Sequence, residues 1–231
     1  MINIAVLPTK LSALAIATAM TAFTPMAASA AEAGDIQVKL LGSGVFPQGD
    51  VDEVLSDPLG LTANADTNVT DSYVPTLAVE FFLLDNVSVE TICCISRKDV
   101  EGQGALQGNE LISNLLVIPA TVTAKYHFDL PGGVKPYIGA GPTHFIIFDE
   151  GVGAGAAALG VDDVSLTSEW GVALQAGVDY ALNDNGLGLT VDAKKYFVGT
   201  TAGFDVGDNR VLEADVELNT WIISGGLSFT F

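Results

Sequence analysis

The chain has 231 residues, of which 49% are hydrophobic, and a formal net charge of −19. Its mean hydropathy is nevertheless +0.42, so the apolar residues must face more than one small soluble core. The excess of carboxylates excludes nucleic acid as a partner, because binding to phosphates needs Lys and Arg. Neither a polar linker nor a repeat of solenoid period divides the chain, which predicts one folded domain.

The first 30 residues have the pattern of a secretory signal peptide. Lys10 precedes an apolar run at 11–23, and Ala-Ser-Ala at 28–30 is a small-x-small cleavage pattern. We expect cleavage after residue 30 and a mature chain of residues 31–231. The alternative is an N-terminal core helix, which the small residues at 28–30 disfavour.

Eight segments of the mature chain alternate between apolar and polar residues with the period of two that a half-buried β-strand shows. The predicted strands are Asp35–Phe46, Tyr73–Leu83, Asn86–Ile95, Val117–Phe128, Lys135–Phe148, Ser168–Leu182, Leu187–Val198 and Trp221–Phe231. The clearest apolar faces begin and end in aromatic residues, as strands do that cross a membrane. We therefore expect nine aromatic side chains at the two membrane interfaces: Tyr73, Phe81, Tyr126, Phe128, Trp170, Tyr180, Trp221, Phe229 and Phe231.

Short and long connections alternate between these strands. Short turn sequences lie at 85–86, 129–133 and 183–186, and long loops at about 47–70, 97–115, 149–166 and 200–214. This order predicts an all-β fold, an eight-stranded antiparallel up-and-down transmembrane β-barrel, with short turns in the periplasm and long loops outside the cell. A closed barrel leaves no strand edge to pair, so we expect a monomer. A soluble lipocalin-type barrel, with its apolar face inside, is the alternative.

The polar faces of the strands carry a set of groups that a barrel would place in its lumen. They are Glu80, Glu90, Lys125, Gln175, Asp179, Asp192 and Lys194. Because eight strands leave room for little more than side chains, we expect an ion-paired plug; a polar throat below an apolar mouth is the alternative. Leucines in the loops could form that mouth or small cores that hold the loops together: Leu55, Leu59, Leu61, Leu106, Leu111 and Leu115.

Catalytic chemistry is not indicated. His127 and His144 have no Ser or carboxylate at a recognisable spacing, and we expect no enzyme, no catalytic residue, no cofactor and no metal. A lipid-modifying enzyme would need such a group at the upper rim of the barrel. Cys93 and Cys94 are adjacent, so we expect two free thiols; a redox or metal role is the alternative.

Several runs in the second half of the chain match a known family. They are Pro-Ala-Thr at 119–121, Tyr-His-Phe at 126–128, Lys-Pro-Tyr-Ile-Gly-Ala-Gly at 135–141, Ser-Leu at 165–166, Glu-Trp-Gly at 169–171, Gln-Ala-Gly-Val-Asp-Tyr at 175–180 and the closing strand. On these residues the chain resembles the OmpW family of small outer-membrane β-barrel proteins.

This resemblance implies a narrow barrel in the outer membrane of a Gram-negative bacterium, a passive conduit for small hydrophobic molecules inward across that membrane. The partners it implies are outer-membrane lipids and lipopolysaccharide, a small hydrophobic ligand, and the barrel-assembly machinery acting through the C-terminal strand. A closed barrel that acts through its surface loops, in envelope stability or surface interaction, is the alternative.

Overall fold

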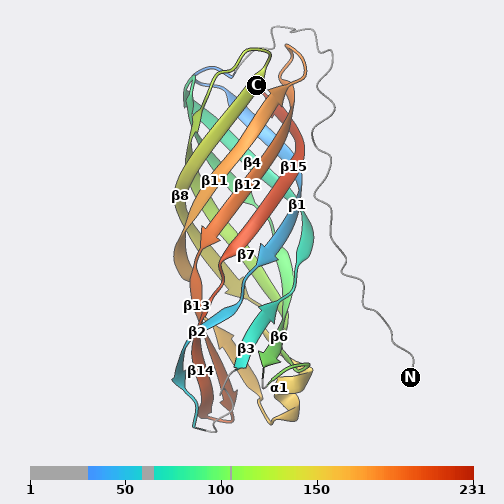
Figure 1. The fold of residues 1–231 in the computed structure, drawn as a ribbon, viewed down its shortest axis with the longest axis vertical. Coiled ribbons are helices and arrows are strands. Elements are labelled where there is room, and N and C mark those ends of the chain that lie inside the picture. Colours follow the sequence, from blue (N-terminus) through green and yellow to red (C-terminus); the bar gives the residue numbers. More distant parts are fainter. Residues whose placement is uncertain (1–30, 59–64, 105) are drawn as a thin grey trace, which may run out of the picture.

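The computed structural model describes residues 31–58, 65–104 and 106–231, and it shows a long β-barrel with a further layer of strands beyond one end (Figure 1). The predicted signal peptide at 1–30 lies outside the described residues. Eight strands form the barrel wall: β1 (Ile36–Pro47), β4 (Ser72–Leu84), β5 (Val87–Cys93), β7 (Glu110–His127), β8 (Val134–Phe148), β11 (Glu169–Ala181), β12 (Leu187–Phe197) and β15 (Thr220–Thr230).

Each barrel strand pairs with its two neighbours in antiparallel register. The order around the barrel is β1-β4-β5-β7-β8-β11-β12-β15, and β15 pairs back onto β1 from Gln37–Thr230 to Pro47–Thr220. The predicted class, an eight-stranded antiparallel up-and-down barrel, is therefore confirmed. Three short turns, after β4, β7 and β11, lie at one end of the barrel, where the end of the chain also lies (Figure 1).

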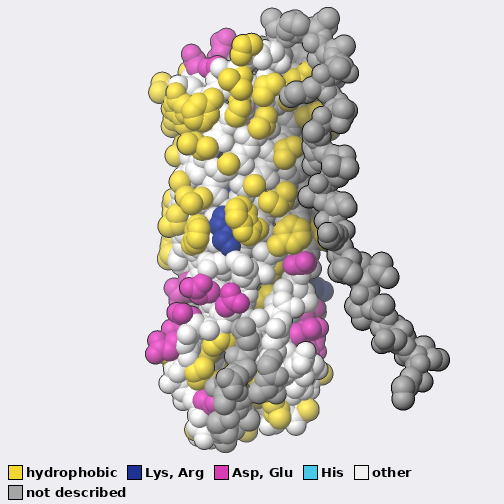
Figure 2. All heavy atoms as spheres, viewed as in Figure 1, with side chains coloured by type: hydrophobic (Ala, Val, Ile, Leu, Met, Phe, Trp, Pro, Cys, Tyr) yellow, Lys and Arg dark blue, Asp and Glu magenta, His cyan; other side chains and the backbone are white. Residues whose placement is uncertain are grey.

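The outer wall of the barrel is apolar. Leu40, Leu174 and Val191, from three different strands, are 54%, 48% and 63% exposed, whereas the polar residues next to them in sequence are buried. Figure 2 shows hydrophobic side chains over the barrel wall and acidic side chains mainly over the lower half of the molecule, with a few at the top. A lipocalin-type barrel has the reverse arrangement, so that alternative is wrong.

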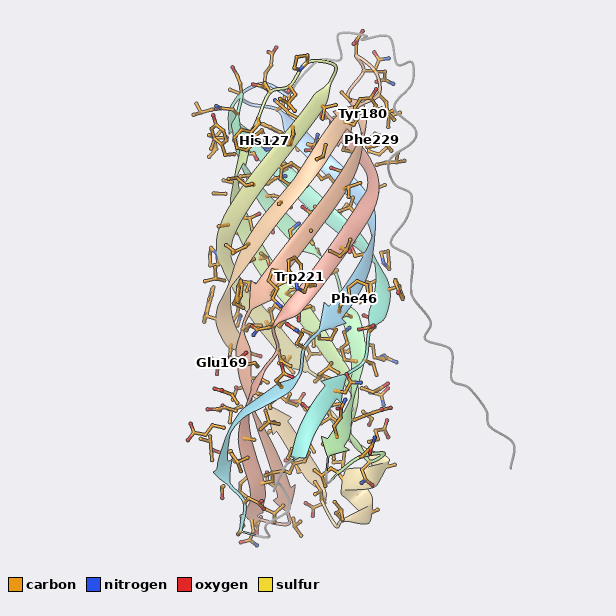
Figure 3. All side chains as sticks on the ribbon, in the orientation of Figure 1. Phe46, His127, Glu169, Tyr180, Trp221 and Phe229 are labelled. Carbon is orange, nitrogen blue, oxygen red and sulfur yellow. The ribbon has the colours of Figure 1, made fainter. Side chains whose placement is uncertain are left out.

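Aromatic side chains lie on the outer wall at both ends of the barrel (Figure 3). Phe46 pairs with Trp221 at the end away from the short turns, and Tyr180 and Phe229 lie near those turns. All nine predicted interface aromatics are exposed or half-exposed on this wall: Tyr73, Phe81, Tyr126, Phe128, Trp170, Tyr180, Trp221, Phe229 and Phe231. Such belts mark the two interfaces of a bilayer.

The segments predicted as long loops contain strands of their own, which we call the extension. They are β2 (Asp50–Ser56), β3 (Ala65–Val69), β6 (Ser96–Gly104), β9 (Gly151–Val152), β10 (Asp163–Leu166), β13 (Gly199–Val206) and β14 (Asn209–Glu217), with one short helix, α1 (Ala154–Ala158). One sheet has the order β10-β13-β14-β2, while β6 pairs with the first half of β7 and β3 pairs with β6. These segments read as loops because their polar faces point to water and bulges interrupt their alternation.

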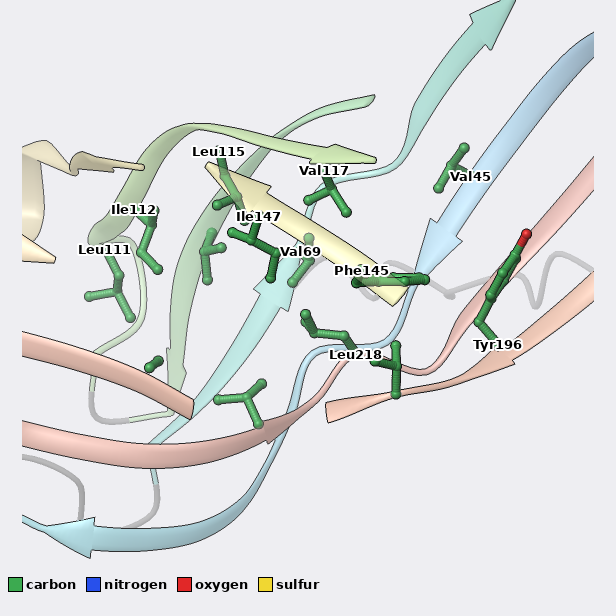
Figure 4. Packing of buried hydrophobic residues seen from close by; sticks show 14 of the residues in the cluster. Val45, Val69, Leu111, Ile112, Leu115, Val117, Phe145, Ile147, Tyr196 and Leu218 are labelled. Carbon is green, nitrogen blue, oxygen red and sulfur yellow. The ribbon is translucent and has the colours of Figure 1, made fainter. Parts of the chain in front are cut away.

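A cluster of buried apolar residues lies inside the extension and at its junction with the barrel (Figure 4). Leu115, Phe145 and Phe204 belong to it, together with Val216 and Leu218. The part of the chain that the structure describes has no helix of the length and apolarity needed to cross a membrane.

Candidate functional site

A network of ion pairs crosses the inside of the barrel, and Glu80 and Glu90 are at its centre. Lys39 Nζ lies 2.7 Å from Glu80 Oε2 and 3.1 Å from Glu90 Oε2. Lys125 Nζ lies 2.7 and 3.0 Å from the same two oxygens. Because these four side chains come from β1, β4, β5 and β7, neighbouring strands of the wall are joined through the lumen. All four are at most 2% exposed.

The network continues to the opposite wall. Lys194 Nζ lies 3.0 Å from Glu90 Oε1 and 2.7 Å from Asp192 Oδ1. The Gln175 amide donates to both carboxylates, at 2.9 Å to Glu90 and 2.7 Å to Asp192. Lys39 also reaches Asp179 Oδ2 at 3.4 Å. These contacts connect β1 and β5 with β11 and β12 across the lumen.

An aromatic side chain completes this interior network. The Tyr137 hydroxyl donates to Asp192 Oδ2 at 2.8 Å, and the Lys125 ammonium lies 3.6 Å from the centre of the Tyr137 ring. Gly177 on β11 makes room for this ring, since a Cβ atom there would lie 2.4 Å from the Tyr137 hydroxyl. Glycine on the inner face of β11 thus permits the hydrogen bond to Asp192.

The network contains more acidic than basic side chains with a fixed charge. Four carboxylates (Glu80, Glu90, Asp179 and Asp192) meet three ammonium groups (Lys39, Lys125 and Lys194), all of them buried. His127 Nε2 lies 2.8 Å from Glu80 Oε1, so the imidazole is a fourth basic group in contact with these carboxylates.

The interior network offers structural contacts rather than an accessible reaction centre. Ser88, His127 and Glu80 contact one another, but Ser88 and Glu80 both bond to the same imidazole nitrogen, and all three side chains are buried. A Ser-His-carboxylate triad instead uses both imidazole nitrogens. No group of three or more His, Cys, Asp or Glu in the described ranges is placed to hold a metal ion. Cys93 is exposed and Cys94 buried, and both are free thiols.

The second candidate site is an apolar cavity in the extension, which we call the chamber. It has a volume of about 60 Å³, and apolar side chains such as Val100, Leu111, Leu115 and Phe204 line it. Thr67 and Thr200 are the hydroxyl-bearing residues of the lining. Figure 4 shows how Leu111, Leu115 and their neighbours converge from different strands on this region. A lining of this kind suits an apolar molecule.

The six leucines predicted for the mouth have different positions. Leu111 and Leu115 are buried and line the chamber, and Leu106 is partly buried at its edge. Leu55 does not line it: its side chain is 47% exposed, because β2 is an edge strand whose register with β14 shifts twice. Leu59 and Leu61 lie outside the described residues.

An open groove lies on the outside of the wall where the barrel meets the extension. The pairing of β11 with β12 ends at Val172 and Phe197. The next backbone hydrogen bond between the two segments runs from Thr167 N–H to the Thr201 carbonyl oxygen. The groove has a volume of about 520 Å³ and contains the aromatic side chain of Trp170. Thr200 and Val216 line both this groove and the chamber, so they form a shared wall.

The seven lumen residues predicted from the sequence all lie in the interior network: Glu80, Glu90, Lys125, Gln175, Asp179, Asp192 and Lys194. Lys39, Ser88, His127 and Tyr137 belong to it as well and were not predicted as members. The alternation of Gln37 and Lys39 with apolar neighbours was a signal that could have identified Lys39. For Tyr137 the glycine-rich strand gave no clear face.

An apolar outer wall, aromatic belts at two levels and a charged interior together define a transmembrane β-barrel of the outer-membrane class. Comparisons with known proteins agree. Outer membrane protein W of Vibrio cholerae serotype O1 is 29% identical over 201 residues, which cover 85% of this chain and 89% of that protein. The outer-membrane protein y4mB of Sinorhizobium fredii is 28% identical over 195 residues, covering 84% and 79%.

The fold has a solved counterpart in the crystal structure of OprG from Pseudomonas aeruginosa. Its TM-score is 0.77 at 22% sequence identity, and the match covers 87% of this chain and 97% of that chain. The sequence model of the OmpW family matches residues 32–231. The chain therefore belongs to the OmpW family, and it is a protein of the outer membrane.

Proposed function

We propose that the protein is a passive conduit which takes small hydrophobic molecules from the outside into the outer membrane. The observation that carries this proposal is the chamber: an apolar cavity enclosed by strands that project beyond the aromatic belt. An apolar molecule gains roughly 0.8 kcal/mol for each CH₂ group that it removes from water. The chamber offers that gain above the polar surface of the membrane.

The interior network implies a sideways exit. A molecule that moved straight on from the chamber would meet the charged groups of Glu80, Glu90 and Lys125, which an apolar compound cannot solvate. Thr200 and Val216 instead separate the chamber from the groove beside Trp170, an aromatic residue of the outer belt. We propose that cargo passes this wall and enters the outer leaflet.

The test is uptake of a small apolar fluorescent compound by vesicles that carry the refolded protein, with heat-denatured protein as the background. Ala202→Phe would fill the chamber, which Ala202 lines, and should reduce saturable uptake to that background. Ala124→Phe adds the same volume on the exposed outer face and should leave uptake unchanged. If Ala202→Phe fails to fold, Ala214→Leu fills the same cavity with a smaller side chain.

Uptake equal to the background with a folded wild-type barrel would contradict the conduit. It would favour the second function, a closed barrel that acts through its surface in envelope stability or surface interaction. The acidic surface of the extension (Figure 2) is the feature available for that role.

A further inference from the structure

Lys98 of β6 is a buried cation in the extension, and it forms no ion pair with a carboxylate of the described residues. Its side chain is 4% exposed, and in the part of the chain that the structure describes no acidic group lies within ion-pair distance of Nζ. The ammonium donates to the carbonyl oxygens of Thr70, at 2.8 Å, and Val45, at 3.3 Å. Since an ammonium has three hydrogens, these two bonds leave one donor.

A second cavity lies against this side chain. Its volume is about 30 Å³, and its lining includes Ser96 and Lys98 among mostly apolar residues. One water needs roughly 10–15 Å³ of such volume, so the cavity has room for about two oxygen atoms. Val69, Leu115 and Leu218 line both this cavity and the chamber, so the charged end lies next to the apolar end.

The energetics favour an anion at this position. Lys98 belongs to β6, which is not one of the eight barrel strands, and burial lowers the pKa of its ammonium to about 8, so the charged form predominates at neutral pH. Asp71 and the Cys94 thiol are the titratable groups that act on it electrostatically. A charge held by two neutral carbonyls is incompletely compensated, and a bound anion would offset that cost.

We propose that the two cavities form one binding site for a small amphiphilic carboxylate. Its carboxylate accepts hydrogen bonds from Lys98 Nζ and the Ser96 hydroxyl, and its hydrocarbon chain lies in the chamber. The inference rests on the proposed function, because the chain of the ligand uses the same chamber. It adds that the conduit distinguishes acids from neutral compounds of equal length.

Octanoate and 1-octanol are suitable probes, because they share the chain and differ in the head group. Equilibrium binding of each labelled compound is measured on the protein in lipid nanodiscs, with empty nanodiscs subtracted. We expect Lys98→Met to weaken octanoate binding roughly tenfold or more, the order expected for a hydrogen bond to a charged group, and to change octanol binding less than twofold. Arg97→Met removes the neighbouring cation, which is exposed, and should change neither.

The pH dependence gives an independent readout. Octanoate binding to the wild type should weaken from pH 7 to pH 9.5 as Lys98 loses its proton, and it should be flat over that range in Lys98→Met. The net charge of −19 repels anions from the surface, so a preference for octanoate cannot come from general attraction.

Equal binding of octanoate and octanol to the wild type, or octanoate binding that Lys98→Met leaves unchanged, would overturn the inference and leave the conduit intact. Binding of neither compound, with a folded barrel, would overturn both proposals.

Discussion

The barrel and the extension have opposite interiors, although the barrel strand β7 continues from one into the other. On the inner face of β7, Leu115 and Val117 lie in the extension, whereas Thr123, Lys125 and His127 follow inside the barrel. The surroundings of each region, lipid or water, determine which side chains face inward. In the membrane the apolar side chains face lipid and the polar ones must find partners inside. In water the extension buries its apolar side chains as any soluble sheet does.

The comparison teaches that each region is held together in a different way. The barrel interior depends on complete pairing of charges, so loss of one partner is costly. The extension depends on packing, so loss of volume is costly. Substitutions on the inner and outer faces of single strands separate these two contributions.

The largest loss of unfolding free energy is expected for Lys194→Ala. It removes the ammonium between Glu90 and Asp192 and leaves both carboxylates buried, which should cost about 3–5 kcal/mol of unfolding free energy. Lys195→Ala is the matched control: this neighbour faces outward and bonds to Gln48, so about 0–1 kcal/mol is expected. Urea unfolding in lipid vesicles measures both. Equal midpoints for the two variants would refute the view that the network stabilises the barrel.

The second-largest loss of unfolding free energy is expected where a packed side chain of the extension is removed. Leu115→Ala enlarges a cavity and removes a side chain that is 2% exposed, so it should cost about 2–5 kcal/mol. Leu174→Ala, on the lipid-facing wall, should cost less than about 1 kcal/mol, because lipid fills the space. The same unfolding measurement applies. A larger loss for Leu174→Ala would reverse the assignment of the two faces.

The close contact between Gly177 and Tyr137 inside the barrel predicts a smaller loss of unfolding free energy. In Gly177→Ala the new methyl group meets the Tyr137 hydroxyl at 2.4 Å and the Val191 carbonyl oxygen at 2.5 Å, so overpacking should cost about 1–3 kcal/mol. The control is Gly225→Ala, where the nearest atom lies 3.8 Å away. If both variants unfold at the wild-type midpoint, Tyr137 does not need the space beside Gly177.

The barrel was predictable from the sequence because one alternation of period two determines both faces of each strand. Glu80, Lys125 and Asp192 were placed in the lumen on that basis alone. Which lumen groups contact one another was not predictable, since it depends on the stagger of strands around the barrel. The pairing of Lys39 with both Glu80 and Asp179 follows from that stagger.

The extension was harder to predict for a different reason. Its segments are acidic on the outside, and bulges break the alternation in β6, β13 and β14, so they resemble loops. The chamber also collects residues from distant segments, such as Val100 and Val216, which no short window of sequence connects. Its leucines were visible in the sequence, but the outward position of Leu55 was not.

The smallest change in unfolding free energy is expected for Lys98→Met. It can be compared directly with Lys194→Ala, because both variants remove a buried lysine. Unlike Lys194, Lys98 forms no ion pair with a carboxylate in the part of the chain that the structure describes, although Thr70 and Val45 each lose a donor. Removal of a costly buried charge should offset those lost bonds, so the unfolding free energy should change by less than about 1 kcal/mol at pH 7. A loss as large as that of Lys194→Ala would contradict this.

The pH dependence of the same variant tests the cause. The folded pKa of Lys98 is about 8, below the ordinary 10.5, so between these values the unfolded chain binds more protons than the folded protein. This lysine should therefore raise the stability of the wild type as pH increases from about 8 to 10.5, and Lys98→Met should lack that contribution. Urea midpoints at pH 7, 8.5 and 10 for the two proteins give the difference directly. Parallel curves would mean that the folded protein binds the proton of Lys98 as tightly as the unfolded chain does, and the cation would then already be compensated without a bound anion.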